Sequence, residues 1–163
     1  MIRPAAPADH PALARLFREM QAYYAVSCPG PDEIEASLAG RPAGTEILVA
    51  EEGTDLAGFA AFSAIYPGPG LAGGLFLKEL FVGGRHRGAG HGRALVRAVA
   101  GQAVARGLTR VDWTADAGKP ELLAFYEGLG AAQKPDKVFF RLDGEGLARL
   151  GGGSAATSRA SEQ

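Results

Sequence analysis

Residues 80–95 read Leu-Phe-Val-Gly-Gly-Arg-His-Arg-Gly-Ala-Gly-His-Gly-Arg-Ala-Leu, which is the most specific pattern in the sequence. An apolar run ends at Val82, a glycine-dense turn follows, and a helix is expected to begin within the turn at Gly90. Glycines allow backbone N–H groups to come close to a ligand, and the start of a helix adds the positive end of its dipole. Arg87 and Arg93 add positive charge, so the stretch predicts a site for a pyrophosphate group.

Three kinds of glycine-rich phosphate site differ in what surrounds the glycines. A P-loop requires Gly-Lys-Ser/Thr, whereas Gly92 is followed by Arg93 and Ala94. The dinucleotide-binding fingerprint requires a small residue at the position of Arg93 and is excluded as well. Residues 87–92 instead fit the pattern Arg/Gln-x-x-Gly-x-Gly/Ala, which resembles motif A of the GNAT superfamily of acetyltransferases. The alternative is an ordinary glycine-rich turn between a strand and a helix.

A second motif lies about thirty residues further on. Residues 122–131 read Leu-Leu-Ala-Phe-Tyr-Glu-Gly-Leu-Gly-Ala and look like motif B of the same superfamily, a helix that ends in Phe-Tyr-x-x-x-Gly. The two motifs occur in the order and spacing of that superfamily, and the resemblance covers roughly residues 1–142. It implies that Tyr126 lies near the thioester sulfur and protonates the leaving thiolate, for which a phenol has a suitable pKa. The alternative is a tyrosine that only packs on an amphipathic helix.

The apolar periodicity predicts an α/β protein with a mixed sheet and helices on its faces. The resemblance implies the GNAT fold, a mixed twisted sheet of about six to seven strands with helices on both faces. Strands are expected at residues 1–4, 46–51, 56–64, 75–82, 111–114 and 138–142. The first helix carries an apolar stripe of Leu13, Leu16, Phe17, Met20 and Tyr24. Further helices are expected at residues 32–38, 90–106 and 120–129. We expect one acetyltransferase domain over residues 1–150, followed by a disordered Gly/Ser/Ala-rich tail over residues 151–163.

Composition restricts the partners. The 163 residues carry a formal net charge of −1, so no basic field favours nucleic acid or an anionic membrane. No apolar run reaches the roughly 20 residues of a membrane helix, and the first residues do not resemble a signal peptide. Cys28 is the lone cysteine, so a cytoplasmic location is expected. His10, His86 and His91 lack metal-ligand spacing, so no metal is expected.

The resemblance implies acetyl-CoA as the co-substrate. In the superfamily, a backbone N–H at the splayed end of the fourth strand holds the thioester carbonyl. Lys119, near the start of motif B, stands where an asparagine is found in the diamine and thialysine acetyltransferases that this chain resembles. The expected coenzyme A contacts are Leu80, Phe81, Val82, Arg87, Gly88, Ala89, Gly90, His91, Gly92, Arg93 and Lys119. Glu79 is a candidate base acting through water, placed by strand alternation on the face opposite Lys78, or else an ordinary surface acid.

Within the superfamily the chain is similar to the diamine (spermidine/spermine) and thialysine acetyltransferase subgroup. The resemblance implies a small primary amine, polyamine- or lysine-like, as the acceptor, and a homodimer. Its substrate contacts would be Tyr23, Tyr24, Lys78, Asp112 and Trp113. Lys78 replaces an acid of the subgroup and would repel a polycation, while Tyr24 is explained equally by the core stripe. The alternative function is a non-catalytic module that binds acyl-CoA as a sensor or partner domain.

Overall fold

The computed structural model describes residues 1–152, and residues 153–163, which make up most of the expected tail, lie outside the described part. Residues 1–123 form one compact unit. Residues from Ala124 onward belong to a second unit, which contains the end of helix α4 (Pro120–Glu127) and helix α5 (Gly144–Leu150). Among the described residues, no helix combines the length and apolar character needed to cross a bilayer.

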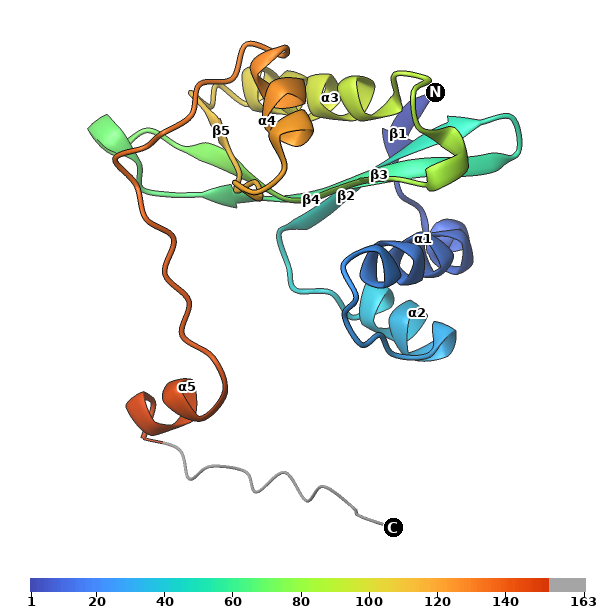
Figure 1. Ribbon diagram of the computed structural model, residues 1–163, viewed down its shortest axis with the longest axis horizontal. Helices are drawn as coiled ribbons and strands as arrows, with labels where there is room; N and C mark the ends of the chain where they lie inside the picture. Colours follow the sequence, from blue (N-terminus) through green and yellow to red (C-terminus); the bar gives the residue numbers. More distant parts are fainter. Residues whose placement is uncertain (153–163) are drawn as a thin grey trace. The chain divides into compact units, whose positions relative to one another are not determined.

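The first unit is built on a mixed five-stranded sheet in the order β1-β2-β3-β4-β5 (Figure 1). The strands are β1 (Ile2–Pro4), β2 (Thr45–Glu52), β3 (Asp55–Ile65), β4 (Gly74–Val82) and β5 (Val111–Asp112). The first four pair antiparallel in chain order, and β5 runs parallel to β4. The turn between Glu52 and Asp55 makes β2 and β3 a hairpin, as its Glu-Gly-Thr-Asp sequence predicts.

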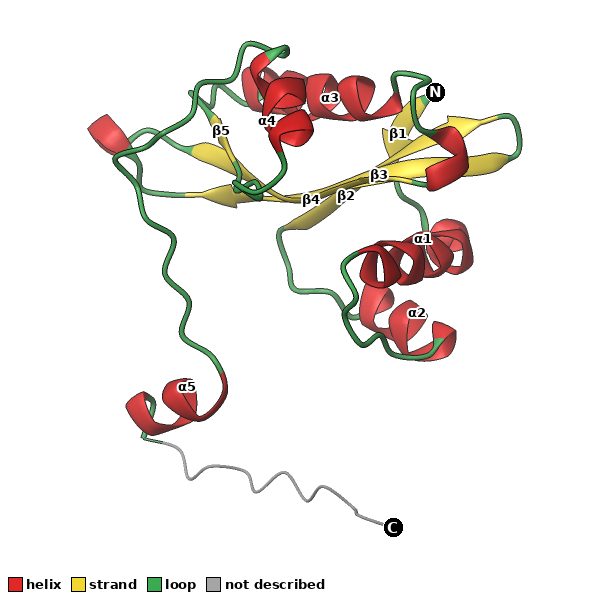
Figure 2. Cartoon of the chain, viewed as in Figure 1, coloured by secondary structure: helices red, strands yellow, loops and turns green. Residues whose placement is uncertain are grey.

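Helices cover both faces of this sheet (Figures 1 and 2). Helices α1 (His10–Tyr23) and α2 (Pro31–Ala39) lie on one face, and α3 (His91–Ala105) packs on the other against β2, β3 and β4. Short 3-10 turns precede α1 (Pro7–Asp9) and follow β4 (Gly84–His86). This arrangement confirms the expected α/β class with helices on both faces.

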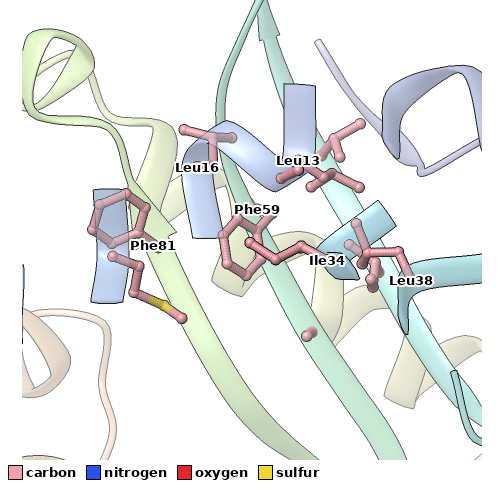
Figure 3. Close-up of a cluster of buried hydrophobic side chains, with 11 residues drawn as sticks. Leu13, Leu16, Ile34, Leu38, Phe59 and Phe81 are labelled. Atoms are coloured by element: carbon pink, nitrogen blue, oxygen red, sulfur yellow. The ribbon is translucent and has the colours of Figure 1, made fainter. Parts of the chain in front are cut away.

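The core between the sheet and α1/α2 follows from strand register. Residues directly opposite each other in neighbouring strands share a face, so Val49, Phe59 and Phe81 point to the same side. Phe17 of α1 stacks on Phe59 with ring centroids 4.4 Å apart. Figure 3 shows this cluster, which comprises Leu13, Ala14, Leu16, Met20, Ile34, Leu38, Ile47, Val49, Phe59, Ala61 and Phe81.

Strand β4 contains a β-bulge that corrects one expectation. Ala61 lies opposite Glu79 and Phe62 lies opposite Leu77, so Lys78 is an extra residue in the ladder. A bulge interrupts the regular alternation of faces. The register places Glu79 on the α1/α2 face, and Lys78 reaches it, with Nζ 3.0 Å from Oε1 of Glu79. Strict alternation, which separates these two side chains, is therefore wrong here.

Three further expectations about the elements are corrected. The sheet of the described residues has five strands, not six to seven, because residues 138–142 form no strand there. The side chains of this segment are exposed, with Phe140 at 86%. An apolar run reads as a strand from sequence, but a strand also needs a neighbour to pair with. Strand β5 is limited to Val111–Asp112, and α1 ends at Tyr23, so Tyr24 leaves the core stripe with its side chain half exposed.

Candidate active site

The turn between β4 and α3 has the backbone that its glycines predict. Gly88 and Gly90 have φ of +83° and +85°, in the left-handed region that glycine adopts without strain. Gly90 is the N-cap of α3, and the helix begins at His91. A Cβ built on either glycine meets no atom within 4 Å, so the turn is open on its outer side.

The turn offers backbone donors. The first four N–H groups of an α-helix have no acceptor within the helix. Among the described residues, none of the N–H groups of Gly88, Ala89, Gly90, His91 and Gly92 donates to a backbone carbonyl. Together with the positive end of the helix dipole, these donors suit an anion.

Three carboxylates hold the turn in place from other elements. Glu19 of α1 accepts the Gly84 N–H at 2.6 Å, and Asp55 pairs with Arg85 at 3.1 Å. Glu52, at the end of β2, bridges two rings of the turn, with its Oε2 2.5 Å from Nδ1 of His86 and 3.2 Å from Nε2 of His91. The hydrogen bond with His86, and then the one with His91, holds the pKa of the Glu52 carboxyl below its ordinary value.

Sequence reasoning missed this tether. Glu52 lies 34 and 39 positions from its two histidines, just beyond the strand expected at residues 46–51. The available signal was the pair of histidines in and beside the glycine motif, because a largely buried imidazole needs a polar partner. A cavity of about 320 Å³ borders the tether, lined partly by Arg15, Glu19 and Arg85. Arg85 in its wall is already paired with Asp55, and the cavity is lined by none of the predicted site residues.

Strands β4 and β5 separate beside the turn. Their parallel pairing is limited to Leu75 with Val111 and Phe76 with Asp112. From Leu77 to Val82, the edge of β4 that faces β5 therefore has no strand partner in the described part of the chain. Leu80, Phe81 and Val82, the predicted coenzyme A contacts on this strand, all lie in that stretch.

Two cations and three aromatic rings meet at the end of α1. The Arg87 guanidinium carbon lies 4.8 Å from the ring centroid of Tyr23 and 5.7 Å from that of Phe81. Lys119 Nζ lies 4.6 Å from the Tyr23 centroid and 4.7 Å from the Tyr24 centroid. The structure thus brings together predicted coenzyme A contacts (Arg87, Phe81, Lys119) and predicted acceptor contacts (Tyr23, Tyr24).

Other predicted acceptor residues are engaged with neighbours. Asp112 pairs with Arg110, with Nε 2.9 Å from Oδ2, which neutralises the carboxylate proposed to bind an amine. Trp113 follows β5 and is half-buried. Lys78 is exposed and forms its ion pair with Glu79, whose side chain is 33% exposed. The candidate base therefore already has a cationic partner.

Tyr126 belongs to the second unit. It lies on α4, where its half-buried ring contacts that of Phe125 with centroids 5.1 Å apart. The helix ends at Glu127, and Gly130 follows with φ of +88°. The local pattern of motif B, a helix that stops before a left-handed glycine, is thus present.

Similar proteins and structures extend this picture. An L-ornithine N5-acetyltransferase of Arabidopsis thaliana is 34% identical over 92 residues, which cover 56% of this chain and 40% of that protein. The chain thus matches less than half the length of this relative. An integron cassette protein from the mobile metagenome of V. cholerae superposes with a TM-score of 0.85 at 28% identity, covering 93% of this chain and 96% of that one.

A third similarity shows the fold alone. An aminoglycoside acetyltransferase from an uncultured soil metagenomic sample has a TM-score of 0.70 at 19% identity, over 88% of this chain and 96% of that one.

The family model described as Acetyltransferase (GNAT) family matches residues 12–131. That match spans both motifs, the open glycine turn and the separated strands, and it covers well over half of the 163 residues. The chain therefore belongs to the GNAT family of acetyltransferases.

Proposed function

We propose that the chain transfers the acetyl group of acetyl-CoA to a primary amine of a small polyamine- or lysine-like molecule. The observation that carries this proposal is the open turn at Gly88 and Gly90, which leads into α3 beside the unpaired edge of β4. A turn of exposed N–H donors suits a pyrophosphate, and a free strand edge suits a chain of amide groups.

The residues present fit coenzyme A. The GNAT family uses acetyl-CoA, which supplies the acetyl thioester. Gly88, Ala89, Gly90, His91 and Gly92 would present backbone N–H groups to the pyrophosphate, and Arg87, Arg93 and Lys119 would add charge. The backbone of residues 80–82 would pair with the amide-bearing arm and donate an N–H to the thioester oxygen.

The transfer needs two proton movements. The acceptor nitrogen must be neutral to form the new N–C bond, and it loses a proton as the C–S bond breaks and the sulfur gains one. Glu79 is the proposed base, acting through water, and Tyr126 is the proposed acid for the sulfur. Because Lys78 contacts the Glu79 carboxylate at 3.0 Å, Glu79 must share its charge with Lys78 while it acts. No covalent bond to the protein is required.

The proposed acceptor class follows from charge and from one relative. Lys78 places an exposed cation beside the candidate base, which disfavours a polycation and favours an acceptor that also bears a carboxylate. L-Ornithine, named as the substrate of the Arabidopsis thaliana relative, is an amine of this kind. We therefore place amino acids with a side-chain amine ahead of spermidine among the candidate acceptors.

The deciding experiment measures the release of free thiol from acetyl-CoA in the presence of individual amines. L-Ornithine, L-lysine, thialysine, spermidine and an aminoglycoside form the panel, with mass spectrometry of the acetylated product. At least one amine should accelerate thiol release well above the rate with acetyl-CoA alone. If coenzyme A binds in calorimetry but no amine in a broad screen accelerates thiol release, the result would instead support the non-catalytic binding module.

We also propose a cytoplasmic homodimer, as the resemblance implies. The exposed apolar side chains of Val138, Phe139 and Phe140 support self-association, because such groups are usually covered in the functional assembly. Light scattering at micromolar concentration should give the mass of two chains, against 16.8 kDa for one. A single-chain mass at every concentration would contradict the dimer.

A further inference from the structure

The two cations beside the glycine turn are held by aromatic rings. Tyr23 lies within 5 Å of both, at 4.8 Å from Arg87 and 4.6 Å from Lys119, and Tyr24 lies 4.7 Å from Lys119. Both tyrosines are about half exposed. Arg87 also donates through Nε to the Val82 carbonyl at 3.2 Å, at the end of β4.

Neither cation has an acidic partner among the residues that the structure describes. Within residues 1–152, the ion pairs of the other arginines include Arg85 with Asp55 and Arg110 with Asp112, whereas Arg87 and Lys119 form none. Exposed cation–π contacts are weak, and a charge-assisted hydrogen bond to a phosphate is stronger. An anion bound in the turn would therefore compete successfully for both side chains.

We propose that Arg87 and Lys119 couple the two substrate sites by moving from the tyrosine rings to the coenzyme. This inference rests on the proposed function, from which it takes the pyrophosphate in the turn and a cationic acceptor. In the free protein the two cations occupy the rings of Tyr23 and Tyr24. When the pyrophosphate draws the cations away, the rings become sites for an ammonium group of the acceptor.

The coupling determines how the acceptor binds. The reacting nitrogen must be neutral, so the group on the tyrosine rings is a second, charged nitrogen of the same acceptor. Before coenzyme A binds, that group meets rings already occupied by like charges. By linkage, coenzyme A and the acceptor strengthen each other's binding by the same factor, roughly fivefold or more for a coupling of ordinary size.

The coupling makes an unusual prediction for coenzyme A alone. Replacing both rings, Tyr23→Leu with Tyr24→Leu, removes the contacts that the cations must give up, so the affinity for coenzyme A should rise roughly fivefold. The matched control, Tyr23→Phe with Tyr24→Phe, keeps both ring faces and should bind as the wild type does. Isothermal titration calorimetry with coenzyme A measures both.

One further background completes the series. In Arg87→Met with Lys119→Met, the leucine pair and the phenylalanine pair should bind coenzyme A equally, because no cation remains to be released. If the leucine pair binds coenzyme A no better than the phenylalanine pair when both cations are present, the coupling is wrong. Unchanged thermal midpoints for the tyrosine variants are expected from their exposure and confirm that the comparison involves folded proteins.

A direct readout follows the lysine itself. Carbon-13 labelling of the lysine ε-methylene groups gives one signal each for Lys78, Lys119, Lys134 and Lys137. The Lys119 signal, identified by its loss in Lys119→Arg, should show ring-current shielding in the free protein and lose it on addition of coenzyme A. If coenzyme A binds but the Lys119 signal stays shielded, the coupling is overturned and the proposed function is not. Wild-type protein that shows no heat with coenzyme A overturns the proposed function itself.

Discussion

At the scale of single residues, the site is defined by charges whose partners the fold supplies. Lys78 reaches Glu79 because a bulge interrupts β4, and Asp112 is neutralised by Arg110. Arg87 and Lys119, by contrast, rest on aromatic rings. These two cations, which form no ion pair within residues 1–152, include one in the glycine turn itself, where an anion is proposed to bind.

Tyr126→Phe tests the proposed acid. The substitution keeps the ring and its contact with Phe125, so coenzyme A affinity and thermal stability should change little. Turnover should fall about 10²- to 10⁴-fold, which is the usual contribution of one general acid. Tyr66→Phe removes a hydroxyl from a 71% exposed ring of the first unit and should leave turnover unchanged. Nearly full turnover in Tyr126→Phe, with chemistry shown to be rate-limiting, would mean that the thiolate leaves without this residue.

Lys78 should set the preference between acceptors. Lys78→Glu exchanges repulsion of a polycation for attraction, so the ratio of kcat/KM for L-ornithine to that for spermidine should fall by about tenfold. Lys78→Arg keeps the charge and should keep the ratio, and Lys78→Gln should fall between the two. Steady-state kinetics with both amines measure these ratios. The charge argument fails if spermidine is already the better acceptor of the wild type.

At the scale of elements, α3 begins and ends at glycines with left-handed backbones. Gly90 caps its start with φ of +85°, and Gly107 follows its end with φ of +66°. The hairpin of β2 and β3 then positions the turn before α3 through Glu52 and Asp55. The turn is thus shaped by its own glycines and oriented by strands that lie far from it in sequence.

The two ends of α3 provide a matched pair of variants. A Cβ at either glycine meets no atom within 4 Å, so Gly90→Ala and Gly107→Ala carry the same kind of backbone strain, about 1–2 kcal/mol. Both should lose similar stability in chemical denaturation. Only Gly90→Ala should also weaken coenzyme A binding, by at least tenfold in calorimetry, because its methyl group occupies the space of the ligand. Equal affinities of the two variants would contradict a pyrophosphate site at this turn.

At the scale of the whole molecule, one partly buried charge network joins the turn before α1 to strands β1 and β2. Arg3 of β1 donates two hydrogen bonds to Asp9, at 2.6 and 2.9 Å, and a third to Glu51 of β2 at 2.8 Å. Asp9 is 9% exposed and also accepts the Ala6 N–H at 2.7 Å. The hydrogen bond from Arg3 lowers the pKa of Asp9 to about 2 from its ordinary 3.8.

This network predicts a pH dependence of folding. Because the folded pKa of Asp9 is depressed, its stabilisation is fully present above the ordinary pKa and is lost as pH falls from about 4 to about 2. Wild type should exceed Asp9→Asn in unfolding free energy by at most about 2 kcal/mol at pH 7, and the difference should shrink over that window. In an Arg3→Met background, the difference in unfolding free energy caused by Asp9→Asn should lose most of its pH dependence. A difference that is constant from pH 7 to pH 2 would contradict the assignment.

The glycine motif, the helix stripes and most strands were predictable because each depends on residues close together in the chain. Gly88 and Gly90 can adopt a left-handed backbone without steric cost, and the spacing of Leu13, Leu16 and Met20 creates one apolar face in any α-helix. The sequence alone was enough to predict a GNAT-type α/β order and an open glycine turn before α3.

Tertiary structure alone decided the rest, since the deciding contacts join residues that are distant in sequence. The bulge at Lys78 depends on the β3 register, and the Glu52 bridge and the placing of Lys119 over Tyr23 span dozens of positions. Residues 138–142 form an apolar run typical of a strand but have no pairing partner among the described residues. Local patterns specify the conformation that a segment prefers, whereas strand pairing and charge partners are properties of the neighbours that folding brings to it.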